Sequence, residues 1–179
     1  MNGSWILRPA RAADGPTLAA LIPESVRALQ APYYSEAQME SALGTIFALD
    51  RQLIEDGTYF VAEEAGRLVG GGGWSRRKSL YGGDAGRAGK DPELDPAIDA
   101  ARLRAFFVHP QWARRGIGRG IVLASERAAV GAGFRRVETV ATLAGEPLYA
   151  ACGYVVRERF EIEMAGGLML PAVRMGKAF

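Results

Sequence analysis

The spacing of apolar positions predicts helices in the first third of the chain. Apolar side chains recur at three- and four-residue intervals after Asp14, a residue type that favours the start of a helix. These positions are Leu18, Leu21, Ile22, Val26 and Leu29. Pro23 falls within the run and predicts a kink or a break. Ser35, with Gln38 at the spacing of a capping box, begins a second predicted helix, and residues 50–56 predict a further helical turn. The apolar stripe of the second helix would consist of Met39, Leu43 and Phe47.

After residue 57 the pattern favours strands. Residues 58–63 and a partner beginning at Leu68 predict a hairpin. The partner contains Gly70 to Gly73, which indicate a bulge or the close approach of another backbone or a ligand. Residues 76–100 predict a long mobile loop or a short helical excursion, and such segments often form lids. The later elements are a strand at 103–108, a helix at about 118–130, a strand at 136–143, a helix at 147–152, a strand at 155–164 and a strand from 168.

Length and composition restrict the class of protein. The chain has 179 residues, 49% of them apolar and 23% charged, which predicts one domain spanning residues 1–179. It has no apolar run of about 18 residues and no segment resembling a signal peptide, so we expect a cytoplasmic protein. A single cysteine, Cys152, excludes an internal disulfide and a multi-cysteine metal cluster. Because His109 is the only histidine, we also expect neither a histidine-rich zinc site nor a Ser-His-Asp triad.

The charge is weak overall but locally concentrated. A net charge of +2 does not indicate a nucleic-acid-binding protein. All but three of the 22 basic residues are arginine, and three of these arginines lie within the six residues from Arg114 to Arg119. The planar guanidinium group suits phosphate recognition, so this cluster merits a functional interpretation.

The segment from Val108 to Arg119 carries the most specific chemistry. A buried strand leads into a turn with Gly116 and Gly118 and then into a helix, whose free N–H groups and dipole suit a phosphate or pyrophosphate. A Walker loop needs a lysine, which this segment lacks. The dinucleotide-binding fingerprint fits poorly, because Ile121 replaces its third glycine and Glu138 lies in the middle of the next strand.

These residues resemble the signature of the GNAT superfamily of acetyl-CoA-dependent N-acetyltransferases. That signature is a strand ending in Val-x-Pro, followed by Gln/Arg-x-x-Gly-x-Gly/Ala. Pro110, Gly116 and Gly118 stand in register, whereas Ala113 occupies the Gln/Arg position. Residues 148–154 resemble a second family segment, Phe/Leu-Tyr-x-x-x-Gly-Phe/Tyr. The resemblance implies an α/β (α+β) fold. We expect a mixed, mostly antiparallel twisted sheet of about six to seven strands, flanked by helices, with a splayed central strand pair.

The resemblance also implies roles for individual residues. Acetyl-CoA would be the acyl donor, without a metal, and a primary amine would attack its thioester directly. Tyr149 would give a proton to the departing thiolate. The residues expected to bind the pantetheine and pyrophosphate are Phe106, Phe107, Val108, Arg114, Arg115, Gly116, Ile117, Gly118 and Arg119. The residues expected in the substrate pocket are Tyr33, Tyr34 and Trp74, with Arg76 as a further candidate and residues 76–100 as a cover.

The general base and the acceptor stay open at this point. The strand at 103–108 contains no carboxylate, so Glu63, Glu64, Glu138, His109 and a chain of water molecules are all candidates. We expect a small-molecule or peptide amine as substrate, no nucleic-acid or membrane partner, and leave a homodimer open. The alternative function is a non-catalytic acyl-CoA-binding or sensing module. Cys152 has no evident base partner and is expected to pack as a small apolar residue.

Overall fold

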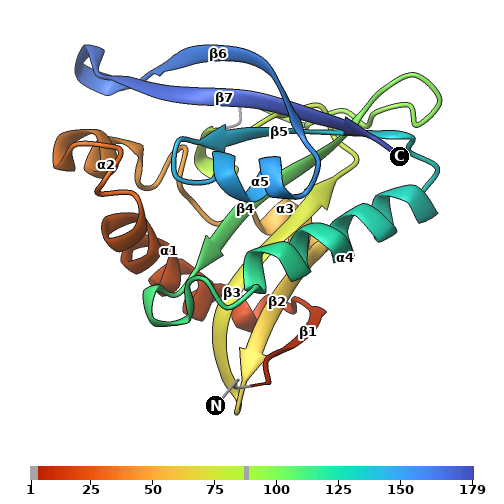
Figure 1. The fold of residues 1–179 in the computed structure, drawn as a ribbon, viewed down its shortest axis with the longest axis horizontal. Coiled ribbons are helices and arrows are strands. Elements are labelled where there is room, and N and C mark those ends of the chain that lie inside the picture. Colours follow the sequence, from red (N-terminus) through yellow and green to blue (C-terminus); the bar gives the residue numbers. More distant parts are fainter. Residues whose placement is uncertain (1–3, 87–88) are drawn as a thin grey trace.

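A seven-stranded sheet forms the centre of the computed structural model, which describes residues 4–86 and 89–179 (Figure 1). The strands are β1 (Ile6–Pro9), β2 (Tyr59–Glu64), β3 (Arg67–Ser75), β4 (Ala101–Val108), β5 (Arg136–Thr142), β6 (Val155–Glu163) and β7 (Met169–Ala178). They lie in the order β1-β2-β3-β4-β5-β7-β6, and only the β4–β5 pair is parallel. The predicted mixed, mostly antiparallel sheet is confirmed. The sequence did not predict β1, because four residues are too few to show an alternating pattern.

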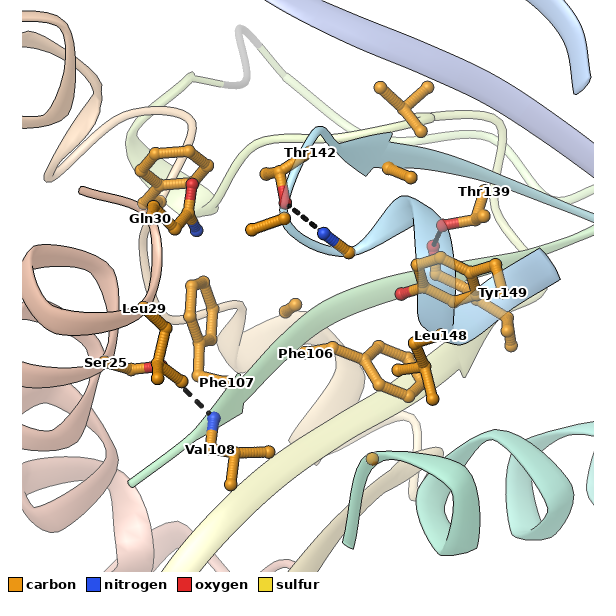
Figure 2. Close-up of a pocket in the computed structure, with 18 of the residues that line it drawn as sticks. Ser25, Leu29, Gln30, Phe106, Phe107, Val108, Thr139, Thr142, Leu148 and Tyr149 are labelled. Carbon is orange, nitrogen blue, oxygen red and sulfur yellow. Dashed lines mark hydrogen bonds between the residues drawn. The ribbon is translucent and has the colours of Figure 1, made fainter. Parts of the chain in front are cut away.

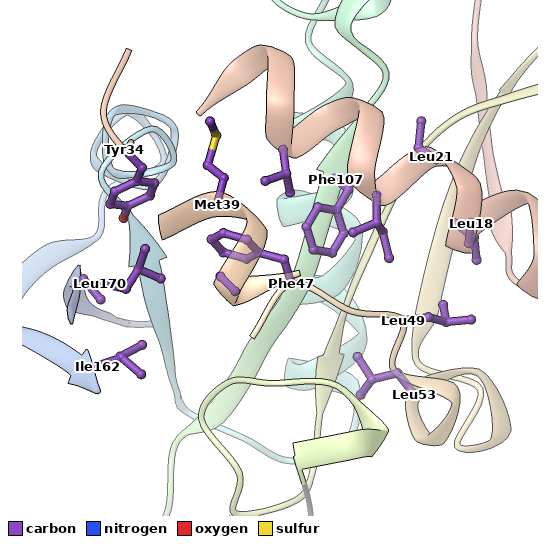
Figure 3. Packing of buried hydrophobic residues seen from close by; sticks show 14 of the residues in the cluster. Leu18, Leu21, Tyr34, Met39, Phe47, Leu49, Leu53, Phe107, Ile162 and Leu170 are labelled. Carbon is purple, nitrogen blue, oxygen red and sulfur yellow. The ribbon is translucent and has the colours of Figure 1, made fainter. Parts of the chain in front are cut away.

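Helices cover both faces of this sheet. They are α1 (Gly15–Leu29), α2 (Glu36–Ala42), α3 (Arg51–Glu55), α4 (Ile117–Gly131) and α5 (Glu146–Ala151). A Cβ added at Gly70 would meet Ile117 of α4, whereas one added at Gly71 would meet Leu18 of α1. Because neighbouring residues of a strand point to opposite faces, α1 and α4 lie on opposite sides of β3. Buried apolar residues of α1, α2, β4 and β7 pack together on the α1 side, among them Phe107 and Leu170 (Figure 3).

Three local predictions in the first third need correction. Asp14 precedes α1, but its carboxylate accepts hydrogen bonds from the Arg8 guanidinium at 2.8 and 2.9 Å and does not cap the helix. Pro23 does not break α1, which continues to Leu29 with buried side chains on both sides of the proline. The helix that begins after Ser35 ends at Ala42, so Phe47 lies outside it, yet tertiary packing still buries Phe47.

The glycines of β3 lie opposite a bulge in β4, as their sequence suggested. Gly71 pairs with Phe107 and Gly73 with Arg104, which leaves one extra residue on β4. Ala105 lies in this bulge with a φ of 58°. A Cβ at Gly72 would lie 2.8 Å from the Phe106 ring, so glycine is needed for the two strands to approach each other.

Beyond the bulge, β4 separates from β5. The two strands pair only where Ala101–Leu103 meets Val137–Thr139, although both continue for several residues. The Tyr59 hydroxyl, from β2 on the far side of β3, donates a 2.7 Å hydrogen bond to the carbonyl oxygen of Ala105 and so helps to hold the bulge. The expected splayed central pair is therefore present, and it opens the sheet between two strands.

Residues 76–100 form a connecting segment, of which residues 87 and 88 lie outside the description. In its described part, regular structure is limited to a short helical turn at Asp84–Gly86 and a bridge between Arg77 and Glu93. The Arg77 guanidinium donates to both oxygens of Asp56 at 2.8 Å and to the carbonyl oxygen of Asp91. These partly buried contacts attach the segment to the end of α3. No helix in the described ranges is long and apolar enough to cross a membrane.

Candidate functional site

A cavity of about 580 Å³ occupies the opening between β4 and β5 (Figure 2). One part, which we call the arginine end, is lined by residues from Ala113 to Arg119 at the start of α4. The other part, which we call the apolar end, is lined by residues 29–34, 46–48 and 80–82 together with β6 and β7. Between them lie the second half of β4, the end of β5 and helix α5. The cavity therefore runs continuously from a helix N-terminus to an apolar chamber.

The part of β4 beyond the bulge forms one wall, and Phe106, Phe107 and Val108 all line the cavity. The N–H group of His109 donates to Val69 in β3, so the preceding N–H, that of Val108, points away from β3. It donates to the Ser25 hydroxyl of α1 at 3.3 Å (Figure 2). The sequence analysis did not identify Ser25, which lies on the buried face of an ordinary amphipathic helix.

The arginine end has the backbone geometry of an anion site. Gly116 precedes α4 with a φ of 81° and provides no side-chain cap, so the N–H groups of the first turn have no capping side chain. Arg114 also has a positive φ, 64°, and successive N–H groups in such a turn form a concave donor surface. Arg114 and Arg119 are among the residues that line the cavity beside this turn, and both carry positive charge.

Arg115 lies elsewhere, which corrects its expected place at the pyrophosphate. Its guanidinium group lies 5.7 Å from the Trp112 ring centre and 4.0 Å from the Glu64 carboxylate. Its carbonyl oxygen accepts a hydrogen bond from the Trp5 indole. Glu64 comes from β2 and Trp5 from the chain before β1, so no local pattern around residue 115 could show these two partners, whereas Trp112 lies only three residues away in the sequence.

Tyr149 lies in α5 with its side chain against the β4 wall. Its ring packs edge-on against Phe106 and Tyr154, with ring centres 5.9 and 5.6 Å away. Tyr149 lines the cavity while only 5% of it is exposed. Burial raises the pKa of its phenol above the ordinary value of 10, and interaction with the Thr139 side chain acts in the opposite direction. The phenol is therefore protonated at neutral pH and is chemically suited to donate a proton.

The three aromatic residues expected in the substrate pocket differ in position. Tyr33 and Tyr34 line the apolar end. The Tyr34 hydroxyl donates to Pro171 at 2.6 Å and accepts from the N–H of Leu143 at 3.0 Å, so it ties the loop after α1 to β7 and the end of β5. Trp74 does not line the cavity, because its ring is buried in the core against Phe134.

Arg76, the further pocket candidate, does not reach the cavity either. Its guanidinium group lies 5.5 Å from the Trp74 ring centre. The segment that contains it nevertheless contributes Leu80, Tyr81 and Gly82 to the apolar end. Part of the expected cover therefore forms a wall of the site.

None of the proposed side-chain bases faces the cavity, and each is engaged elsewhere. Their partners are Arg8 for Glu63, Trp112 for Glu64, Arg102 and Arg174 for Glu138, and Arg67 and Glu24 for His109. Within residues 4–86 and 89–179, no carboxylate or imidazole lines the cavity. Cys152 is also absent from the lining, and burial raises the pKa of its thiol, which disfavours a thiolate nucleophile.

Residues 55–156, more than half of the chain, match the family described as the acetyltransferase (GNAT) domain. The chain belongs to the GNAT acetyltransferase family. It is accordingly an acyltransferase of the acetyl-CoA-dependent class. No curated protein matches this GNAT chain. The matched range includes the whole arginine end, α5 and the bulged strand.

Solved structures share the fold at low sequence identity. A GCN5-related N-acetyltransferase from Rhodopseudomonas palustris is 23% identical, with a TM-score of 0.69 over 97% of this chain and 95% of its own. PaiA N-acetyltransferase from Thermoplasma acidophilum, solved with coenzyme A, is 16% identical. Its TM-score is 0.65 over 98% of this chain and 99% of its own. YncA from Salmonella typhimurium, solved with acetyl-CoA, is 17% identical. Its TM-score is 0.63 over 98% of this chain and 94% of its own. These similarities establish the shared GNAT fold.

Proposed function

We propose that this GNAT protein transfers the acetyl group of acetyl-CoA to a primary amine, which attacks the thioester directly. The observation that supports this most is the continuity of the cavity. It extends from an uncapped helix N-terminus, through the opening between β4 and β5, to a chamber large enough for an acceptor. CoA-bound and acetyl-CoA-bound structures of the same fold are consistent with a donor in this position.

The residues of the cavity fit the parts of the donor. The N–H groups of residues 116–119, with Arg114 and Arg119, would hold the pyrophosphate. A Cβ at Gly118 would lie 3.0 Å from Leu148, so glycine keeps α4 close to α5 at the point where the ligand would pass. The backbone of Phe106, Phe107 and Val108 would bind the pantetheine arm, with Val108 exchanging its hydrogen bond to Ser25 for one to the arm.

The reaction requires two proton transfers. The nitrogen lone pair of the neutral amine forms a bond to the acetyl carbon, and the bond from that carbon to sulfur breaks. Tyr149 donates its phenolic proton to the departing thiolate, and the acetylated nitrogen releases its extra proton to water. Water then returns a proton to Tyr149. Because the lining described above contains no side-chain base, the acceptor itself must reach the site as a neutral amine.

A coupled assay tests this proposal. Release of free CoA from acetyl-CoA, with the acetylated amine identified by mass spectrometry, should occur with at least one member of a broad panel of primary amines. Arg114→Ala with Arg119→Ala should raise KM for acetyl-CoA by about tenfold or more, since each arginine to phosphate contact is a charge-assisted hydrogen bond. Binding of acetyl-CoA without turnover of any amine would instead support the acyl-CoA-binding module.

Other parts of the proposal stay predictions. We propose a single domain over residues 1–179, a cytoplasmic location, and a small-molecule or peptide amine as the acceptor. A homodimer also stays a prediction.

A further inference from the structure

We infer that the acceptor is an amine attached to an aromatic or branched apolar group without a second charge, and that Gln30 recognises its nitrogen. This inference rests on the proposed function, because it concerns the chamber next to the proposed thioester position. It identifies a substrate class and a specificity-determining residue.

The walls of the apolar end favour an apolar substrate. Side chains from four separate segments line it, namely Leu29, Tyr34, Phe47, Tyr81, Ile162 and Leu170. Most of these side chains are buried, whereas Tyr33 and Tyr81 are partly exposed. Flat or branched apolar groups gain the most from such walls, since burial of apolar surface is favourable at about 25 cal/mol per Å².

The charges around the cavity disfavour a second charge on the acceptor. Its charged lining residues in the described ranges are Arg104, Arg114 and Arg119. Two of these belong to the arginine end. The third, Arg104, is paired with Asp50 at 2.8 Å and also donates to the carbonyl oxygen of Gly82. A cationic or anionic tail in the apolar end would therefore lose its hydration without meeting an opposite charge, which is costly.

Most polar side chains at the apolar end and beside it are already engaged. The Tyr34 hydroxyl both donates and accepts, and the Thr142 hydroxyl accepts from the N–H of Gly145 at 3.0 Å (Figure 2). These groups hold the backbone in place and are not free to recognise an incoming amine.

Gln30 is different. It lines the apolar end, only 8% of it is exposed, and its Oε1 has no hydrogen-bond partner in the described chain (Figure 2). An unpaired buried carbonyl oxygen is unfavourable, and an amine N–H would relieve this cost. Because the oxygen is buried, recognition of the amine requires a turn about the last side-chain torsion that presents it to the cavity.

The backbone of Gln30 is fixed, so its side chain starts from a defined point of the chamber wall. Its N–H donates to Val26 at 3.0 Å, and its carbonyl oxygen accepts from the N–H groups of Tyr33 and Tyr34 at 2.9 and 3.0 Å. The residue therefore ends α1 and begins the loop that lines the chamber. A side chain on such a fixed backbone can orient the amine lone pair toward the thioester.

A matched amine series tests the substrate class. We expect 2-phenylethylamine and isoamylamine to have kcat/KM values at least about tenfold above those of spermidine and of 4-aminobutyrate, because burial of an unpaired charge costs more than 1.4 kcal/mol, the equivalent of a factor of ten. A preference for spermidine or for 4-aminobutyrate would overturn the inference while supporting the proposed function. Failure to acetylate any amine, with acetyl-CoA bound, would overturn both.

Variants of Gln30 test its role. Gln30→Met keeps the size of the side chain but removes the acceptor oxygen, so KM for 2-phenylethylamine should rise about fivefold, the value of one hydrogen bond of about 1 kcal/mol. Gln30→Glu should shift the preference toward spermidine. KM for acetyl-CoA should stay unchanged in both variants. Gln52→Met, the same substitution at a residue outside the cavity, should leave both KM values unchanged.

The KM values of the variants decide whether Gln30 recognises the acceptor. An unchanged amine KM in Gln30→Met, or an equal rise in the KM for acetyl-CoA, would contradict recognition of the acceptor by Gln30. If Gln30→Met does not fold, Gln30→Glu still tests the inference through the ratio of spermidine to 2-phenylethylamine turnover.

Discussion

Tyr149 shows how one residue can be buried and still chemically accessible. Its ring is enclosed by Phe106 and Tyr154, yet it lines the cavity where the thioester would lie. The same burial that fixes the ring raises the pKa of the phenol above 10. A general acid must stay protonated until the thiolate leaves, so this shift favours the proposed role.

At the residue scale, Tyr149→Phe should lower kcat by about 100-fold or more, since the variant has no proton to donate. KM for acetyl-CoA should change little, because the aromatic ring and its packing are retained. Tyr154→Phe is the matched control, since Tyr154 packs against Tyr149 but does not line the cavity, and its kcat should stay near that of the native protein. Equal losses in both variants would indicate a structural role for Tyr149.

The pH dependence follows from the same residue. The raised pKa keeps Tyr149 protonated through the neutral range, so its deprotonation should not lower kcat below pH 10. The rate should instead rise with pH as the acceptor loses its proton, because no described side-chain base lines the cavity. When rate is measured against pH for two amines of different basicity, the midpoints of the two curves should differ by the difference between the pKa values of the amines. The same dependence of rate on pH for both amines would indicate a base in the protein.

At the scale of elements, the β3 glycines and the β4 bulge act together. The bulge turns the second half of β4 away from β5, and the glycines let β3 follow it closely despite the Phe106 ring. The glycines stand out in the sequence, but Phe106, which makes glycine necessary at position 72, lies more than 30 residues further along the chain. A bulge in one strand thus accompanies the opening in which we propose that the donor binds.

Gly73→Ala tests whether β3 also needs glycine on its side toward β2. The new Cβ would lie 2.3 Å from the carbonyl oxygen of Thr58, a backbone atom that cannot move aside, so the free energy of unfolding should fall by at least about 2 kcal/mol. Urea unfolding measures the change. Gly131→Ala, where the added Cβ meets nothing within 4 Å, should not lower stability. Similar losses in the two variants would contradict the steric explanation.

At the scale of the whole molecule, the cavity lies where helices α1, α4 and α5 meet the opened sheet. Ligand binding there contacts segments from residue 25 to residue 172, so it should stabilise the fold as a unit. Acetyl-CoA at 100 times its Kd should add about 2.7 kcal/mol to the free energy of unfolding. NAD and ATP at the same concentration should produce no comparable rise in Tm. An equal rise with NAD would favour a dinucleotide-binding protein.

Much of the fold could be predicted because its signals are local. Helical spacing identified α1, alternation identified β6, and the glycines at 116 and 118 identified the turn before α4 that we propose binds the pyrophosphate. Errors arose where tertiary contacts outweighed local preference. The packed face of α1 keeps the helix continuous through Pro23, and the apolar core takes up Phe47 without a helix.

The sequence by itself determined the order of the elements, the family signature and the loop that would hold a pyrophosphate, because each depends on residues close together in the chain. Only the tertiary structure decided which side chains share the cavity. It placed Arg115 near Glu64 and Trp5, Trp74 in the core and the candidate bases on other partners, and it brought Gln30 to the chamber. The physical reason is that a side chain's environment is set by segments distant in sequence, which no local pattern records.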